Sequence, residues 1–278
     1  MSGILYLVGT PIGNLGDFSP RAVKTLEEVD FIVAEDTRVS LKLLNHFGIK
    51  KPLTSYHRHN CDTAGPHILS RLLAGESCAL VTDAGMPAIS DPGEDLVRLC
   101  AENNVEVQTI PGCCALVCAL ALSALPTGRF TFEGFLPTNK KNRRAHLQSL
   151  LGEERTMLFY EAPHKLKGTL EDLYETFGDR LITLCRELTK LHEETRRTTL
   201  TQAIIYYSEN EPKGEFVLVL GGAEKHEELT VTLEDAVAMV LKLRENGERM
   251  KDAVRQISAD TGLNKNELYE ASLQAERQ

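Results

Sequence analysis

The sequence predicts an α/β fold made of two α/β domains, at residues 1–125 and 126–223, and a helical helix-turn-helix-like tail at residues 230–278. Short apolar runs alternate with amphipathic segments through the first 125 residues, a pattern typical of repeated strand–helix units. Pro126-Thr127-Gly128 interrupts this series, and a second series follows. After residue 230 the apolar residues recur with helical spacing.

Local signals bound the elements of the first domain. Ile4–Val8 has the apolar composition of a strand, and Ser19 with Pro20 supplies the cap and first-turn proline of the next helix. Gly48 and Gly75 end two later helices. Further strands are predicted at 29–34, 53–56, 78–82 and 105–110, and helices at 19–28, 37–47, 63–74, 93–103 and 113–125. Such a series predicts a largely parallel sheet with helices on both faces.

The second domain continues the alternation of strands and helices. Strands are predicted at 130–136, 156–160, 181–186 and 215–220, and helices at 142–151, 167–177 and 201–208. The strands are nearly continuous in valine, leucine and isoleucine, which is typical of strands buried on both faces.

The tail contains three predicted helices, at 233–244, 249–259 and 265–273. The last two flank a turn that contains Gly262, an arrangement similar to a helix-turn-helix. A helical hairpin that packs as a cap or a dimer arm has the same spacing. The sequence alone does not choose between the two.

Bulk composition fits an ordinary globular protein. The chain has 278 residues, 42% of them hydrophobic, and a net charge of −9, which argues against indiscriminate binding to nucleic acid. A local basic patch remains compatible with that charge. Seven cysteines without framework spacing fit reduced thiols.

The compartment is predicted to be the cytoplasm, without a membrane contact. The first eight residues carry neither a charged leader nor a long apolar region, so we expect no signal peptide. The apolar segment at 113–125 is too short to span a bilayer. His57, His59 and Cys61 alternate as metal ligands can, but no second ligand pair follows, so we expect no metal site.

The loop from residue 83 to 93 is the most informative stretch. Asp83 ends a buried strand, and Gly85 and Pro87 follow at once. Asp91 can cap the next helix, with Pro92 as its first residue. Ligands bind at the carboxyl ends of strands in open α/β sheets, so we predict a ligand site here rather than a turn alone.

Other strand ends carry similar polar or glycine-rich segments. The loop with Gly9, Gly13 and Gly16 matches neither the dinucleotide fingerprint nor a phosphate loop, and it is either a ligand contact or a Pro-Gly turn. Asp36 or Thr37 can cap a helix, while Glu35 and Arg38 can face a substrate. The small residues from Ile110 to Ala115 offer backbone N–H groups. Because polar strand ends occur in both domains, we predict a cleft between them.

One dense basic run stands out in this acidic chain. Lys140, Lys141, Arg143 and Arg144 follow Asn139 closely, which indicates a polyanion contact. A solvated helix face is the alternative interpretation of these four residues.

Six segments together resemble a known family. They are 8–15, 34–38, 83–93, 134–137 (Gly-Phe-Leu-Pro), 160–164 (Tyr-Glu-Ala-Pro-His) and 186–190 (Arg-Glu-Leu-Thr-Lys). In order, and over nearly the whole chain, they are similar to the ribosomal RNA small subunit methyltransferase I family, the RNA-modifying branch of the tetrapyrrole methylase superfamily. Met86, where the family usually has threonine, and Cys113-Cys114, where a Pro-Ser-like pair is usual, depart from its pattern.

The resemblance implies a tetrapyrrole methylase-like fold, with S-adenosylmethionine bound in the cleft between the two domains, and a homodimer. It implies methylation of the ribose 2′-oxygen of a cytidine in the decoding region of small-subunit rRNA (16S rRNA), free or in the 30S particle. The implied cofactor contacts are Pro11, Ile12, Asp83, Gly85, Met86, Cys114, Ala115, Tyr160, Leu188, Glu215 and Phe216.

Methyl transfer to a ribose hydroxyl needs alignment and a group that orients or removes the hydroxyl proton. The catalytic candidates, left unranked, are Asp36, His57, Glu161 and Lys190. RNA phosphates are predicted to contact Arg38, Lys140, Lys141, Arg143 and Arg144. Two other functions remain open: a methyltransferase for a small tetrapyrrole-type molecule, and a non-catalytic RNA-binding assembly factor.

Overall fold

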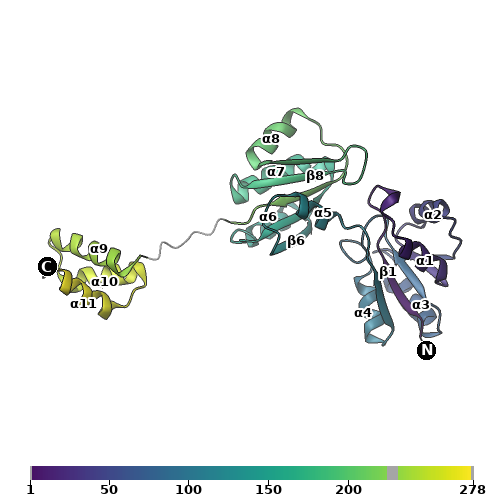
Figure 1. Ribbon diagram of the computed structural model, residues 1–278, viewed down its shortest axis with the longest axis horizontal. Helices are drawn as coiled ribbons and strands as arrows, with labels where there is room; N and C mark the ends of the chain where they lie inside the picture. Colours follow the sequence, from purple (N-terminus) through teal and green to yellow (C-terminus); the bar gives the residue numbers. More distant parts are fainter. Residues whose placement is uncertain (1, 224–230, 277–278) are drawn as a thin grey trace. The chain divides into compact units, whose positions relative to one another are not determined.

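The computed structural model describes residues 2–223 and 231–276, and the chain divides into two compact units, residues 1–223 and 224–278. The first unit contains two five-stranded sheets, and the second contains three helices (Figure 1). We describe each unit by itself.

The first sheet is entirely parallel, with the strand order β3-β2-β4-β1-β5, which confirms the predicted parallel arrangement. Its strands are β1 (Ile4–Val8), β2 (Phe31–Ala34), β3 (Leu53–Ser55), β4 (Cys78–Val81) and β5 (Glu106–Ile110). The connecting helices are a short 3₁₀ helix (Leu15–Asp17), α1 (Pro20–Glu28), α2 (Thr37–His46), α3 (Cys61–Leu73) and α4 (Glu94–Glu102).

Helices cover both faces of this sheet (Figure 1). Successive strand residues point to opposite faces, so Ile32 joins the cluster with α1 and α2, whereas Phe31 joins the cluster with α3 and α4. All four residues of β2 are buried. The near-continuous apolar runs in the sequence therefore reflect two cores, one on each face.

The second sheet is mixed, with the order β6-β7-β10-β8-β9. Its strands are β6 (Phe130–Phe135), β7 (Thr156–Glu161), β8 (Leu181–Arg186), β9 (Glu194–Thr199) and β10 (Phe216–Leu220), and its helices are α6 (Lys140–Ser149), α7 (Pro163–Phe177) and α8 (Leu200–Glu209). β6 and β7 pair in parallel, but β10 runs antiparallel to both β7 and β8. Hydrophobic runs reveal that a strand is buried but not its direction, so the alternation alone did not predict this mixed pairing.

Two local predictions were wrong. The edge strand β9 was missed, because its sequence Glu-Thr-Arg-Arg-Thr-Thr lacks an apolar run, as edge strands often do. The helix after the 83–93 loop starts at Glu94 and is capped by Gly93, so Asp91 is not its cap and Pro92 lies before it. By contrast, Ser19 caps α1 as predicted, and of the two candidate caps for α2 it is Asp36 that caps the helix.

Helix α5 (Ala115–Leu122) follows β5 in the sequence but packs on the second sheet. Its Leu116, Ala119 and Leu120 contact Leu158 of β7 and Val219 of β10 within one buried cluster. On the other face of the same sheet, α6, α7 and α8 bury a separate cluster (Figure 1). We therefore propose that the two α/β domains divide near Gly112 rather than at residue 125.

The second unit consists of α9 (Leu233–Glu245), α10 (Met250–Thr261) and α11 (Lys265–Glu276). The three helices share one core, which includes Val240, Val254 and Leu268. α10 ends at Gly262 in the left-handed conformation, at the predicted turn. Residue 230, where the tail was predicted to begin, lies outside the described residues. Across residues 2–223 and 231–276, we find no helix with the length and apolarity needed to cross a membrane.

Candidate functional site

A cavity of about 510 Å³ lies in the first unit and is lined by residues from both sheets. The first sheet contributes residues that follow the carboxyl ends of β1, β2, β4 and β5, and the second contributes the ends of β6, β7 and β8. Because β10 runs antiparallel, its first residue, Phe216, pairs with Glu161 and Arg186 at the same edge. Polar residues at the strand ends, which the sequence indicated as ligand contacts, thus line one cavity.

The wall from the first sheet depends on a close approach of two backbones. A Cβ atom on Gly9 would lie 2.7 Å from Gly112 Cα and 2.6 Å from Met86 Sδ. Gly85 forms a two-way bridge with Thr10, with N···O distances of 2.9 and 3.2 Å. Glycine at position 9 therefore lets the β1 and β5 loops meet behind Met86.

Three carboxylates, Glu35, Asp83 and Asp91, line this part of the cavity. Burial raises the pKa of Asp91 to about 6, and the neighbouring Glu35 and Asp83 add to the effect. Burial also raises the pKa of Asp83 and the pKa of Glu35. Each shift reflects first the cost of holding a negative charge away from water, and a bound cation would reduce that cost.

The loop that bears Asp91 is held by Arg58, whose Nη2 donates to the Ser90 carbonyl at 2.7 Å. Ala88 and Ser90 both have positive φ angles, 65° and 66°. Non-glycine residues adopt this conformation at a cost, and such residues concentrate at functional sites.

The wall from the second sheet is aromatic. Tyr160 of β7 packs edge-on against Phe132 and Phe135, with ring centroids 4.9 and 5.5 Å apart. Its hydroxyl accepts the Leu116 backbone N–H at 3.3 Å, which joins β7 to the first turn of α5. Burial raises the pKa of Tyr160 to about 12, so the phenol stays neutral.

The loop after β8 is anchored by ion pairs. Lys190 Nζ lies 2.8 Å from Glu187 Oε1 and 2.9 Å from Glu215 Oε2, and Glu187 Oε1 also accepts the Glu215 amide. Burial lowers the pKa of Lys190, but the hydrogen bonds to both carboxylates outweigh it and the net shift is upward. Lys190 is therefore a cation near neutral pH and an unsuitable proton acceptor.

Most of the predicted cofactor residues line the cavity: Ile12, Asp83, Gly85, Met86, Cys114, Ala115, Tyr160, Leu188, Glu215 and Phe216. Two of the catalytic candidates, Glu161 and Lys190, line it as well. Within the described part of the first unit, the lining does not include Pro11, Asp36 or His57.

Asp36 is engaged elsewhere. It pairs with Arg38 at 2.6 Å, and the hydrogen bond from Arg38 lowers the pKa of Asp36 to about 2. A carboxylate with so low a pKa accepts protons poorly at neutral pH. Its backbone N–H donates to Asp83 at 3.2 Å, so Asp36 contacts a residue of the cavity wall.

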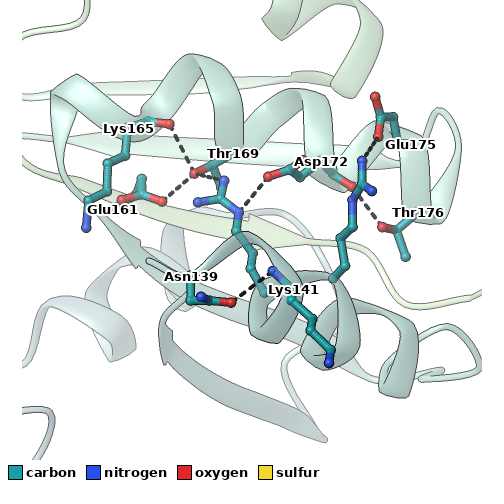
Figure 2. A network of polar contacts seen from close by, with 10 residues as sticks. Asn139, Lys141, Glu161, Lys165, Thr169, Asp172, Glu175 and Thr176 are labelled. Carbon is teal, nitrogen blue, oxygen red and sulfur yellow. Dashed lines mark hydrogen bonds and ion pairs between the residues drawn. The ribbon is translucent and has the colours of Figure 1, made fainter. Parts of the chain in front are cut away.

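The four basic residues at the start of α6 differ in how far they are exposed to solvent. Lys140, Lys141 and Arg144 of α6 are exposed, and Arg144 lies 4.0 Å from Glu175. Arg143 is only 9% exposed, and its guanidinium contacts Asp172 at 2.6 Å and Thr169 at 2.8 Å. Figure 2 shows Thr169 and Asp172 side by side on α7, facing α6. The structure therefore does not place Arg143 with the exposed cations of the run, because its guanidinium is buried against Asp172.

Sequence reasoning overlooked several lining residues. Asp91, predicted to be a helix cap, lies in the 83–93 loop and lines the cavity. Phe135 lies inside the family-like 134–137 segment and lines the cavity too. Glu187 falls in another such segment. Cys185 is a buried residue of β8 and also lines the cavity. Nothing in the sequence around Cys185 indicates that it lies at the cavity.

Comparisons with known proteins agree with this architecture. The model of the family described as Tetrapyrrole (Corrin/Porphyrin) Methylases matches residues 4–204. Among solved structures, the methyltransferase CobJ is similar with a TM-score of 0.60 and 20% identity, covering 80% of this chain and 95% of that one. Diphthine synthase is similar with a TM-score of 0.59 and 14% identity, covering 80% and 90%. At these identities the structures support the fold.

Curated relatives are much closer in sequence. A ribosomal RNA small subunit methyltransferase I from Synechocystis sp. is 51% identical over 99% of both chains. Another from Halalkalibacterium halodurans is 47% identical over 96% of this chain and 93% of its own. The chain therefore belongs to the tetrapyrrole (corrin/porphyrin) methylase family and, within it, to the relatives named ribosomal RNA small subunit methyltransferase I.

Proposed function

We propose that this protein transfers a methyl group from S-adenosylmethionine to a ribose 2′-hydroxyl of small-subunit rRNA, on a cytidine of the decoding region. The cavity at the shared edge of both sheets carries this proposal, together with nearly full-length identity to relatives that bear the rRNA methyltransferase name. S-adenosylmethionine supplies a methyl group that is already activated by a positively charged sulfur. The protein's task is then mainly alignment.

The cavity fits this cofactor chemically. Apolar side chains such as Ile12, Met86 and Leu188 suit the uncharged parts of the molecule. The carboxylates of Asp83 and Asp91 would balance its positive charge. A volume of about 510 Å³ lies in the range of ordinary cofactor sites.

Glu161 is our candidate for the group that holds the hydroxyl proton. It is 4% exposed, ends β7 and lines the cavity, whereas Asp36 is already bound to Arg38. Lys190, held as a cation by two carboxylates, would help to position the substrate rather than remove a proton.

RNA would be held by groups of two kinds. Exposed cations at Arg38, Lys140, Lys141 and Arg144 would contact phosphates. Phe135 is 57% exposed at the cavity wall and offers a ring face to an unstacked base. The bulge between Phe132 and Gly134 shifts the register just before Phe135.

We also propose a homodimer in the cytoplasm. Val117 on α5 and Leu191 in the loop before β9 are apolar yet 54% and 93% exposed, which supports contact with a second copy. Light scattering on the purified protein tests this proposal, and a monomeric mass at micromolar concentration would contradict it.

The central test is methyl transfer itself. Purified protein with labelled S-adenosylmethionine should label small-subunit rRNA, either free or in the 30S particle, at a ribose. RNA that stays unlabelled under both conditions would overturn the proposal. Addition of a tetrapyrrole should not compete. RNA binding with no cofactor affinity by calorimetry would favour an assembly factor instead.

A further inference from the structure

We infer that Arg143 and Thr169 are positioning residues that orient the cavity carboxylate of Glu161. The inference rests on the proposed function, in which Glu161 acts at the substrate hydroxyl. The buried side chains of Arg143 on α6, Thr169 on α7 and Glu161 on β7 are joined by two successive hydrogen bonds. Arg143 Nη2 donates to Thr169 Oγ1 at 2.8 Å, and Thr169 Oγ1 donates to Glu161 Oε2 in a short hydrogen bond.

The direction of these bonds follows from the donors available. A guanidinium only donates, so Thr169 Oγ1 must accept from Arg143 and has a single proton of its own to give. Two acceptors compete for this proton: Glu161 Oε2 and the Lys165 carbonyl at 3.1 Å, one turn earlier in α7 (Figure 2). A threonine within a helix ordinarily bonds that carbonyl. Glu161 offers a carboxylate oxygen, which is a stronger acceptor than a peptide carbonyl, so we assign the hydroxyl proton to the bond with Glu161.

Glu161 is fixed at both oxygens. Oε1 accepts the backbone N–H of Ala162 at 2.9 Å, and Oε2 accepts the Thr169 hydroxyl. Each oxygen keeps further lone pairs, and Glu161 lines the cavity while being 4% exposed. The two bonds therefore set the plane of the carboxylate and leave it able to accept a hydrogen bond from a substrate.

Arg143 is itself immobilised. Its Nε lies 2.6 Å from Asp172 Oδ2. Asp172 lies one turn after Thr169 on α7 (Figure 2). Thr169 is fully buried and Arg143 is 9% exposed. Fixed second contacts of this kind hold reactive groups within the narrow geometry that catalysis requires. Arg143 thus differs from its neighbour Arg144, which lies at the surface.

A matched pair of threonines provides the test. Thr169→Val keeps the volume and removes the hydroxyl, whereas Thr169→Ser keeps the hydroxyl. Thr176, also on α7, donates to the Asp172 backbone carbonyl at 2.8 Å, so Thr176→Val removes a similar bond outside the line to Glu161. Unfolding by urea is measured for each variant so that activity is compared among folded proteins.

We expect Thr169→Val to lower kcat by about 10- to 100-fold, as loss of alignment does, with the KM for cofactor and RNA nearly unchanged. Thr169→Ser should recover most of the rate, and Thr176→Val should behave as wild type. Arg143→Lys should lower kcat, whereas Arg144→Ala should raise the KM for RNA. A Thr169→Val enzyme with normal kcat would overturn the inference.

Two controls separate this inference from the proposed function. If the wild type methylates rRNA but Glu161→Gln is fully active, the positioning role fails and the proposed function stands. A crystal structure of Thr169→Val gives a readout that needs no activity. In it the Glu161 carboxylate should turn away from its present plane, and an unchanged carboxylate would refute the inference even if no methyl transfer is found.

Discussion

The phenolic oxygen of Tyr160 accepts the backbone N–H of Leu116 at 3.3 Å, so the second sheet holds the first turn of a helix that follows the first sheet in the chain. Cys114 and Ala115, which begin that turn, line the cavity. This hydrogen bond therefore connects Tyr160, in the cavity wall of the second sheet, to the segment that carries Cys114 and Ala115.

Replacing Tyr160 by phenylalanine removes this bond and keeps the ring. We expect the free energy of unfolding to fall by about 0.5–1.5 kcal/mol, the usual net value of a hydrogen bond, and cofactor affinity to weaken. Urea unfolding and calorimetry measure the two effects. Tyr174→Phe, at an exposed position on α7, is the control and should change neither.

Cofactor affinity should depend on pH through Asp91. Its pKa is raised to about 6 by burial, so acidification from pH 7.5 to 5.5 protonates this carboxyl and removes a negative charge that faces the cavity. Calorimetry should show the wild-type affinity for S-adenosylmethionine falling over this range. Asp91→Asn should bind weakly with little dependence on pH. A wild-type affinity that is constant with pH would contradict the assignment.

Acidification should have the opposite effect on the free energy of unfolding of the ligand-free protein, which protonation of the Asp91 carboxyl group should increase. The folded pKa of Asp91 lies above its value in the unfolded chain, so between about pH 4 and 6 the folded state binds more protons than the unfolded state. The free energy of unfolding contributed by this group must then decrease as the pH rises. Without ligand, Asp91→Asn should be more stable than the wild type at pH 7 and should lose that advantage near pH 4. Glu102→Gln, at the exposed end of α4, should be neutral in urea titrations.

Phe135→Ala should weaken RNA binding by about 1–3 kcal/mol, the cost of losing one stacked base. Phe135→Tyr should restore the affinity. Phe130→Ala provides the control, because Phe130 is also partly exposed but begins the same strand at its other end. Equal losses for Phe130→Ala and Phe135→Ala in filter binding would argue against stacking on Phe135.

Gly9→Ala should destabilise the first sheet by about 1–3 kcal/mol or more, because the added Cβ overlaps the Gly112 backbone. It should also displace Met86 and lower cofactor affinity. Gly128→Ala introduces a Cβ with no neighbour within 4 Å and should leave both properties unchanged. Chemical denaturation and calorimetry distinguish the two variants.

The centre of the first sheet was predictable because β2 and β4 are buried along their whole length, and burial leaves a direct trace in the sequence. In β2, Phe31 and Ile32 serve opposite faces, so both must be apolar. β9 leaves no such trace, since the threonines and arginines of an edge strand resemble a loop. Strand direction in the second sheet depends on long-range pairing of β10, which no local pattern encodes.

The lining of the cavity was predictable where polar residues and strand ends coincide, as at Asp83 and Glu161. It was not predictable where the outcome depended on which way a helix faces. Arg143 and Arg144 are adjacent and chemically identical, yet one contacts Asp172 in the interior and the other lies at the surface. Their difference comes from the packing of α6 on α7, since neighbours in a helix point about 100° apart.

The contact of Gly9 with Gly112 joins two loops that are remote in the sequence, so the binding site exists only after β1 and β5 have paired. A ligand that recognises this site binds the native state alone and shifts the folding equilibrium by mass action. An increase in melting temperature on addition of the cofactor therefore reports that β1 and β5 have paired in the folded protein.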